Sequence, residues 1–226
     1  MIDFDKYTGH KNIDGVKHKI INQIPKHNTY IELFAGSASI LSNITVPAAN
    51  IILNDLDINV VEYLKNKFPD GTVKNICSAV FLKTEIAVLD LKTFIFVDPP
   101  YLHSTRPNNV NIYNFEMNLD EHIELITSLL ELKCFVMVIH PKCNLYDEMF
   151  KDWRIIEIKI RYNRKTSIEC LYMNYSDEID LQCYDKLGLN CWDRQRIKRK
   201  GDRFVNKLLN LPMQERNYIL DRIKEM

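Results

Sequence analysis

Four consecutive residues, Asp98-Pro99-Pro100-Tyr101, carry the clearest chemical signal in the sequence. They follow the apolar run Phe94–Val97, which predicts a buried strand, and the carboxyl ends of such strands bind ligands in open α/β sheets. Two successive prolines lack N–H groups and leave the nearby carbonyls as acceptors. The Asp98 carboxylate and the Pro99 carbonyl can therefore hold both hydrogens of an amino group, while Tyr101 offers an aromatic face for stacking.

An amino group held in this way matches adenine N6 or cytosine N4. These nitrogens are poor nucleophiles because their lone pair is delocalised into the ring, so catalysis depends on positioning and electrostatics. The plainer interpretation is a proline-rich strand exit in which Asp98 caps a neighbouring group and Tyr101 fills a gap. Chance occurrence of the tetrapeptide in a chain of this length is roughly a one-in-a-thousand event, which favours the chemical interpretation.

A second pair of features indicates an adenosine-type cofactor. The run Tyr30–Ser39 predicts a strand that turns into a glycine-containing loop, where Gly36 lets the backbone approach a ligand. Asn54-Asp55 ends the next predicted strand about twenty residues later, where an acidic side chain commonly binds ribose hydroxyls. The alternative role for Asp55 is to cap the following helix, which Asp57 could do equally well.

Short apolar runs alternate with amphipathic stretches, a pattern typical of an α/β protein with a mostly parallel sheet. The last two strands are separated by four polar residues and predict a closing antiparallel hairpin. The predicted strands are Thr29–Phe34, Ile51–Asn54, Val73–Cys77, Phe94–Val97, Cys134–Ile139, Arg154–Tyr162 and Ser167–Asn174. The predicted helices between them are Gly15–Ile24, Asp57–Lys67, Leu119–Leu132 and Leu145–Phe150.

Composition limits the partners, the cellular location and the bound metals that can be expected for this chain. The chain has 226 residues, 46% of them hydrophobic, and equal numbers of basic and acidic residues, so its total charge indicates neither a nucleic-acid nor a membrane partner. No run approaches the roughly 18 apolar residues that span a bilayer, and a soluble protein of the bacterial or phage-infected cytoplasm is expected. Six cysteines without a CxxC pair and six histidines without ligand spacing predict free thiols and no metal.

The order of four motifs resembles the Dam-type class of DNA adenine-N6 methyltransferases, especially small phage-borne members, as far as about residue 175. The motifs are Tyr7-Thr8-Gly9-His10-Lys11, Glu32–Gly36, Asn54-Asp55 and Asp98–Tyr101. The resemblance implies a Rossmann-like S-adenosylmethionine-dependent methyltransferase fold with S-adenosylmethionine as cofactor. It also implies the cofactor-binding residues. Tyr7, Lys11 and Glu32 contact the cofactor, Phe34, Ala35 and Gly36 surround its methionine moiety, Asp55 binds the ribose, and Asp98 lies beside both cofactor and target amine.

The chain departs from that class in three places. Ala38 stands where a second glycine is usual, and Cys77-Ser78 stand where an acidic residue often reads the cofactor adenine. Only 42 residues separate Asp55 from Asp98, whereas larger members carry a target-recognition insert there. Sequence recognition is therefore weak, or it comes from the loop His103–Phe115, the hairpin near Arg161–Lys165 or the C-terminal segment. In the loop, Arg106 and Tyr113 are the predicted substrate contacts, while His140 after the fifth strand is expected to be structural.

The neutral total charge hides a basic C-terminal segment. From Cys191 to Met226 there are ten Lys or Arg against five Asp or Glu, in two helix patterns broken at Leu211-Pro212. We therefore divide the chain into a methyltransferase domain, 1–190, and a basic helical extension, 191–226. A solvated helix face is one explanation of the charge. Contact with DNA phosphates is favoured by the density of Arg194, Arg196, Lys198, Arg199, Lys200 and Arg203.

These features together predict a site-specific DNA methyltransferase that flips an adenine out of duplex DNA and methylates N6 by direct displacement, without a metal or a covalent protein intermediate. Three alternatives stay open at this point: cytosine-N4 methylation of DNA, adenine methylation of RNA, and a non-catalytic nucleic-acid-binding module. The sequence also leaves open whether a restriction nuclease is a partner, as part of a restriction-modification or phage-protection system.

Overall fold

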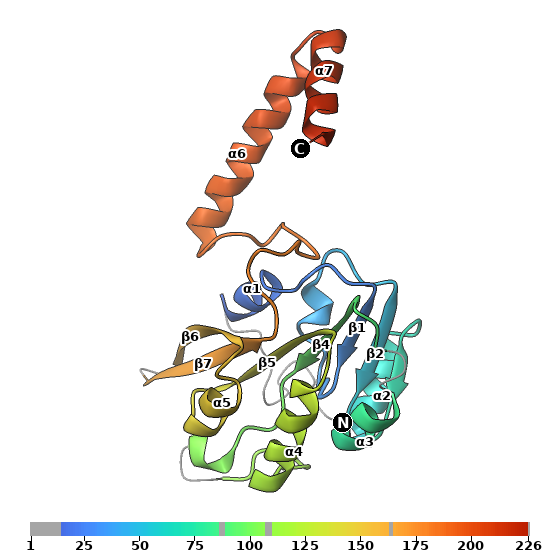
Figure 1. Ribbon diagram of the computed structural model, residues 1–226, viewed down its shortest axis with the longest axis vertical. Coiled ribbons are helices and arrows are strands. Elements are labelled where there is room, and N and C mark those ends of the chain that lie inside the picture. The colour runs from blue at the N-terminus through green and yellow to red at the C-terminus, as the bar shows by residue number, and fades with distance from the viewer. Residues whose placement is uncertain (1–14, 86–88, 107–109, 163–164, 226) are drawn as a thin grey trace. The chain divides into compact units, whose positions relative to one another are not determined.

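The fold is built on a seven-stranded sheet with the strand order β3-β2-β1-β4-β5-β7-β6 (Figure 1). The structure, a computed structural model, describes residues 15–85, 89–106, 110–162 and 165–225. The first five strands pair in parallel, and β7 is antiparallel to both of its neighbours. The strands are β1 Thr29–Glu32, β2 Asn50–Asn54, β3 Thr72–Lys74, β4 Thr93–Val97, β5 Phe135–Pro141, β6 Arg154–Tyr162 and β7 Lys165–Met173.

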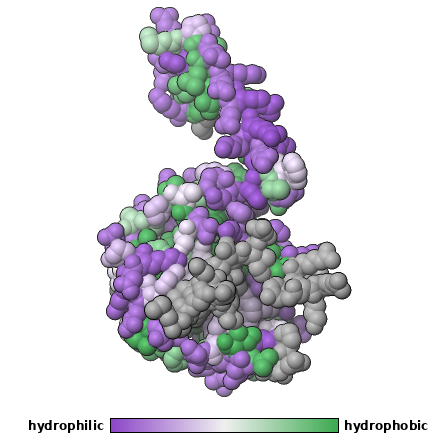
Figure 2. All heavy atoms as spheres, turned by 180° about the vertical axis from the view of Figure 1, so that it is seen from behind, coloured by the Kyte–Doolittle hydropathy of each residue, from purple (hydrophilic) through white to green (hydrophobic). Residues whose placement is uncertain are grey.

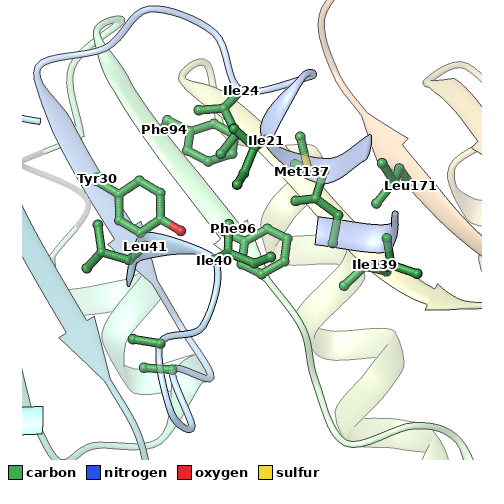
Figure 3. Close-up of a cluster of buried hydrophobic side chains, with 14 of the residues drawn as sticks. Ile21, Ile24, Tyr30, Ile40, Leu41, Phe94, Phe96, Met137, Ile139 and Leu171 are labelled. Atoms are coloured by element: carbon green, nitrogen blue, oxygen red, sulfur yellow. The ribbon is translucent and has the colours of Figure 1, made fainter. Parts of the chain in front are cut away.

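Helices cover both faces of this sheet and bury two apolar clusters against it. The helices are α1 Val16–Ile21, α2 Ile58–Lys67, α3 Ser78–Thr84, α4 Leu119–Leu130 and α5 Asn144–Met149, with short 3-10 turns at Leu41–Asn43 and His103–Thr105. One cluster joins α1 and α2 to alternate residues of the sheet, among them Tyr30, Phe94, Phe96 and Met137 (Figure 3). The other joins α3, α4 and α5 to the residues between, such as Ile31, Ile95 and Val136. This alternation follows from the two-residue period of a strand.

The predicted α/β class, with a mostly parallel sheet, a closing antiparallel hairpin and C-terminal helices, is confirmed. One helix is absent from the prediction: Ser78–Thr84 forms α3, which packs Phe81 and Leu82 into the core. The predicted strand Val73–Cys77 ends at Lys74. Its last residues leave the sheet because Asn54 binds the backbone N–H and carbonyl of Ile76 through its side chain.

The first residues of α2 show that Asp55 does not cap this helix. Asp57 is the N-cap of α2, and its Oδ1 accepts a hydrogen bond from the Asn59 N–H at 2.9 Å. Because a helix has one N-cap, the Asp55 carboxylate is left for other contacts. At α4, Asn118 and Glu121 form a reciprocal capping box, which fixes where the chain enters that helix after the loop following β4.

The chain divides into two compact units, Met1–Cys183 and Tyr184–Met226. The second contains α6 Cys191–Leu209 and α7 Met213–Lys224, and no described residue of either helix is buried. Figure 2 shows hydrophobic side chains gathered on one part of this unit and hydrophilic ones along the rest. Large apolar side chains such as Phe204, Leu209 and Ile223 are more than half exposed. The domain division at residue 190 remains a prediction.

The described residues also bear on membrane and metal. No helix within them is long and apolar enough to cross a bilayer. Among those same residues, no group of three His, Cys, Asp or Glu side chains is arranged to hold a metal ion. The six cysteines are free thiols, and Cys134, Cys170 and Cys183 are buried.

Candidate functional site

A cavity opens at the carboxyl ends of β1, β2, β3 and β4. Its walls come from the segments that follow these strands, together with part of the loop before α4 and the first turns of α4. β1 lies between β2 and β4, so the chain reverses direction across the sheet at this point, where open α/β sheets bind ligands. Predicted site residues that line the cavity are Glu32, Phe34, Ala35, Gly36, Asp55, Asp98, Pro100 and Tyr113.

Asp55 joins the glycine loop to the start of α2. One carboxylate oxygen accepts the Gly36 N–H at 2.8 Å and the other accepts the Asp57 N–H at 2.9 Å. Burial raises the pKa of Asp55, and these backbone hydrogen bonds oppose that rise. Each oxygen has a second lone pair, so the carboxylate can accept further hydrogen bonds from a ligand in the cavity.

The loop after β1 keeps a glycine-like backbone at a residue that is not glycine. Gly36 and Ala38 both have φ of 49°, in the left-handed region. That region costs a residue with a Cβ roughly 1–2 kcal/mol. The loop is closed by hydrogen bonds from Ala38 N–H to the Ala35 carbonyl and from Ser42 N–H to the Ala38 carbonyl. The departure at Ala38 therefore keeps the loop conformation and stores strain in it.

Glu32 places a buried carboxylate in the cavity wall. It is 3% exposed, and its Oε1 accepts a hydrogen bond from the Tyr30 hydroxyl at 2.6 Å. Burial, with the nearby charge of Asp98, raises the pKa of Glu32 to about 7 against the opposing effects of the Tyr30 and Leu41 hydrogen bonds and of Lys67. A carboxylate held at such cost is suited to a positively charged ligand group.

The tetrapeptide leaves β4 beside the same cavity. Asp98 and Pro100 line the cavity, whereas Pro99 is buried and Tyr101 is partly exposed. The Tyr101 hydroxyl donates to Glu169 Oε1 at 2.6 Å. Burial, with the charges of Asp98 and Glu169, raises the pKa of Tyr101 well above its usual range. Tyr101 is therefore a neutral phenol that donates a hydrogen bond, and its ring is held from the hydroxyl end.

The loop after the tetrapeptide is braced by Glu116, which the sequence reasoning did not single out. Both guanidinium NH₂ groups of Arg106 donate to the Glu116 carboxylate, at 2.7 and 2.6 Å, and the backbone N–H groups of Ile112 and Tyr113 donate to it at 2.6 and 2.9 Å. Despite some burial, these bonds lower the pKa of Glu116 to about 2. The only signal in the sequence was an acid ten residues after a basic residue in an Asn-rich stretch.

This brace changes how the predicted substrate contacts are interpreted. Arg106 is 7% exposed, and its guanidinium lies 5.5 Å from the centre of the Tyr113 ring. Its charge therefore interacts with Glu116 and Tyr113 within the loop. Tyr113 and Phe115 reach the cavity wall. Asn114 ties the loop to the start of α2, since its amide donates to Asp57 Oδ2 at 2.8 Å. A substrate contact by Arg106 or Tyr113 remains a prediction.

The remaining predicted residues lie elsewhere. Tyr7 and Lys11 are outside the described residues. The predicted cations of the C-terminal segment are on α6, in the second unit, and are partly or fully exposed: Arg194, Arg196, Lys198, Arg199 and Lys200. Cys77 and Ser78, the positions that depart from the Dam-type pattern, line the cavity together with Ile76.

Comparison with solved structures finds proteins of similar architecture at low sequence identity. A proposed methylase from Haemophilus influenzae is 18% identical over 72% of this chain and 90% of its own, with a TM-score of 0.47. A proposed methyltransferase from Streptococcus mutans, solved in complex with SAH, is 10% identical over 69% and 94%, with a TM-score of 0.45. A precorrin-6y C5,15-methyltransferase from Geobacter metallireducens is 10% identical over 76% and 95%, with a TM-score of 0.48. No curated protein sequence matches the chain.

A family model identifies the chain more specifically. The model for D12 class N6 adenine-specific DNA methyltransferases matches two overlapping segments, residues 7–85 and 57–164, which together cover more than half of the sequence. The match includes all four motifs on which the Dam-type resemblance depends. The chain therefore belongs to the D12 class N6 adenine-specific DNA methyltransferase family, which makes it a methyltransferase with S-adenosylmethionine as its cofactor.

Proposed function

We propose that this protein transfers a methyl group from S-adenosylmethionine to N6 of an adenine in duplex DNA. The observation that supports this most directly is that Asp98, the acceptor in the tetrapeptide, lines the same cavity as Gly36 and Asp55. Methyl donor and target amine can then meet within one cavity, which is what a direct displacement needs. The family supports adenine in DNA as the target.

The cavity residues suit this cofactor. S-adenosylmethionine supplies a methyl group on a positively charged sulfur, which is already activated for displacement. The buried carboxylate of Glu32 would offset the positive charge of the cofactor's methionine end, beside the Phe34–Gly36 loop. Asp55 would accept the ribose hydroxyls through lone pairs that its backbone contacts leave available. Ile76 and Cys77 provide an apolar wall for the adenine, and Tyr7 and Lys11 are further proposed contacts.

The tetrapeptide would hold the methyl acceptor. With the target adenine flipped out of the duplex and stacked on Tyr101, the Asp98 carboxylate and the Pro99 carbonyl would accept hydrogen bonds from N6. These bonds localise the nitrogen lone pair and point it at the methyl group. In a direct displacement the sulfur of the cofactor would keep the electron pair of its bond to the methyl group, N6 would bond to the methyl carbon, and Asp98 would accept one N6 proton. Pro100 would complete the wall beside the reacting nitrogen.

We propose that α6 contributes contacts to the phosphate backbone. Arg196, Arg199, Arg203 and Lys207 recur at intervals of three and four residues, which places them on one face of the helix, with Lys200 at its margin. Arg194 and Lys198 lie off this row. No described residue of α6 is buried. A row of exposed cations on a helix is suited to a line of phosphates, whose neutralisation gives affinity without sequence preference.

The experiment uses the Asp98→Ala variant and DNA from methylation-deficient cells. The wild-type protein and the exposed control variant Asp70→Ala should both incorporate labelled methyl groups, and digestion of the product should yield N6-methyladenine by mass spectrometry. Asp98→Ala should retain its fold and lose transfer. Substantial turnover by Asp98→Ala would refute the assignment. N4-methylcytosine in the digest, or preference for RNA in competition with duplex DNA, would move the function to one of the alternatives.

A further inference from the structure

The ring of Tyr101 is held by side chains from β5 and β7. Its hydroxyl donates to Glu169 Oε1 on β7 at 2.6 Å. The His140 ring on β5 meets it edge-on, with the ring centres 5.3 Å apart and the planes at 68°. The next residue of the chain, Leu102, donates its backbone N–H to His140 Nε2 at 3.1 Å. The side chain and the backbone that follows it are thus fixed by the same pair of strands.

His140 is itself locked in one orientation. Because Nε2 accepts the Leu102 N–H, the ring proton lies on Nδ1, which faces the Pro141 carbonyl at 2.8 Å. The His140 ring also stacks on Tyr146, with centres 3.8 Å apart and planes at 6°. Tyr146 in turn shares a 2.8 Å hydrogen bond with His122 Nδ1. All three rings are fully buried, so the wall behind Tyr101 is rigid.

Burial of the Glu169 side chain at this position costs desolvation free energy. It lies within β7, opposite Pro141 of β5, and is 9% exposed. Burying a carboxylate costs far more than burying an apolar side chain of the same size, and a core strand gains no stability from it. The Tyr101 hydroxyl donates a hydrogen bond to this side chain, and at 2.6 Å the bond is short enough to be strong and directional.

We propose that Glu169 is a positioning residue for methyl transfer, which sets the plane of the Tyr101 ring against the His140 wall and thereby places the target base against Asp98. The inference rests on the proposed function, since it requires a base stacked on Tyr101. A base stacked on a ring follows the tilt of that ring. Misplacement of a reacting group by about 1 Å can cost on the order of a hundredfold in rate, so control of this tilt matters for transfer.

The test compares two substitutions of nearly equal size. Glu169→Gln keeps an oxygen that can accept the Tyr101 hydroxyl, whereas Glu169→Met has no such acceptor. Tyr101→Phe removes the donor from the other side, and the double variant Glu169→Met/Tyr101→Phe closes the cycle. Methyl transfer to DNA from methylation-deficient cells gives kcat and the KM for S-adenosylmethionine, and thermal unfolding reports the fold.

We expect Glu169→Met and Tyr101→Phe each to lower kcat by about tenfold or more, with the KM for S-adenosylmethionine within about twofold of wild type. Glu169→Gln should retain kcat within about threefold, and the double variant should be no slower than the slower single variant. A merely structural role would change KM and unfolding as well as kcat.

Three results would overturn the inference. The first is a wild-type kcat in Glu169→Met, the second is an equal loss of kcat in Glu169→Gln and Glu169→Met, and the third is losses of kcat that multiply in the double variant. The wild-type reaction separates the two proposals. If wild-type protein transfers no methyl group to DNA, both fail. If it does and the variants behave as in any of those three results, only the role of Glu169 fails.

Discussion

The buried carboxylate of Glu32 makes a quantitative prediction about stability and pH. The Glu32→Gln variant removes the ionisable group but keeps a carbonyl oxygen for the Tyr30 hydroxyl. The pKa of Glu32 rises from an ordinary value of 4.5 to about 7 in the folded protein. That difference corresponds to about 3 kcal/mol at roughly 1.4 kcal/mol for each pKa unit.

The sign follows from proton linkage. Because the folded state holds the Glu32 proton more tightly than the unfolded state, this stability is fully present below about pH 4.5 and is lost as pH rises through about 7. Wild-type protein should therefore lose up to about 3 kcal/mol relative to Glu32→Gln between pH 4.5 and 8, or on the order of 6–12 °C in melting temperature.

The assay is urea or thermal unfolding of both proteins at several pH values in this range. Comparing the two proteins cancels the titrating groups that do not interact with Glu32, among them His122, whose pKa burial lowers to about 4. Any fixed effect of the amide, for instance against the Leu41 N–H, shifts all points equally. The reasoning is wrong if the difference in stability between the two proteins is the same at pH 5 and pH 8.

Three further predictions concern the loop, the brace and the basic helix. Ala38→Gly should change unfolding free energy by less than about 1 kcal/mol, because relief of the left-handed backbone offsets a lost methyl contact, whereas Ala38→Val should destabilise by more than about 2 kcal/mol in urea unfolding. Glu116→Ala should lower the free energy of unfolding by about 3 kcal/mol, because Arg106 is left buried without its carboxylate partner. Wild-type protein should lose stability as pH falls from 4.5 towards 2, and the variant should not; an unchanged acid transition in the variant would contradict this. Arg199→Gln/Arg203→Gln should lower the salt slope of DNA binding by about two in fluorescence anisotropy, and Arg194→Gln/Lys198→Gln by clearly less; equal effects would argue against the proposed face.

Much of the sheet could be predicted because its strands are short apolar runs or alternate apolar with charged residues. Phe94–Val97 and the hairpin strand Arg154–Tyr162 have residue types that leave little choice of element, and the structure agrees. The helix α3 is absent from the predicted helices, although its seven residues are no fewer than the six of α5, which the sequence predicts. Its start after Cys77 depends on Asn54 drawing Ile76 out of the sheet, a contact across 22 residues that local patterns cannot encode.

The candidate site divides in the same way. Asp55 and Asp98 could be found because each directly follows a strand, and Gly36 because it lies in the loop after one; Glu32 came from the family resemblance. Parallel strands bring these ends together. Glu116 and Glu169 could not, since one acts through a loop that closes on itself and the other meets Tyr101 from a strand 68 residues away. Charge alone does not reveal a carboxylate whose partner is fixed only by the fold.

The position of β1 between β2 and β4 also constrains how the protein folds during synthesis. Glu32 and Phe96 are register partners across more than sixty residues, so β1 has only β2 beside it until β4 has been made. The chain between β1 and β4 must close into a loop, with a loss of entropy, before the contacts between these strands can stabilise it. This requirement slows formation of the central sheet. A nascent chain that ends before Thr93 therefore exposes one edge of β1 and lacks the acceptor Asp98. The cavity assembles only when the middle of the sheet does.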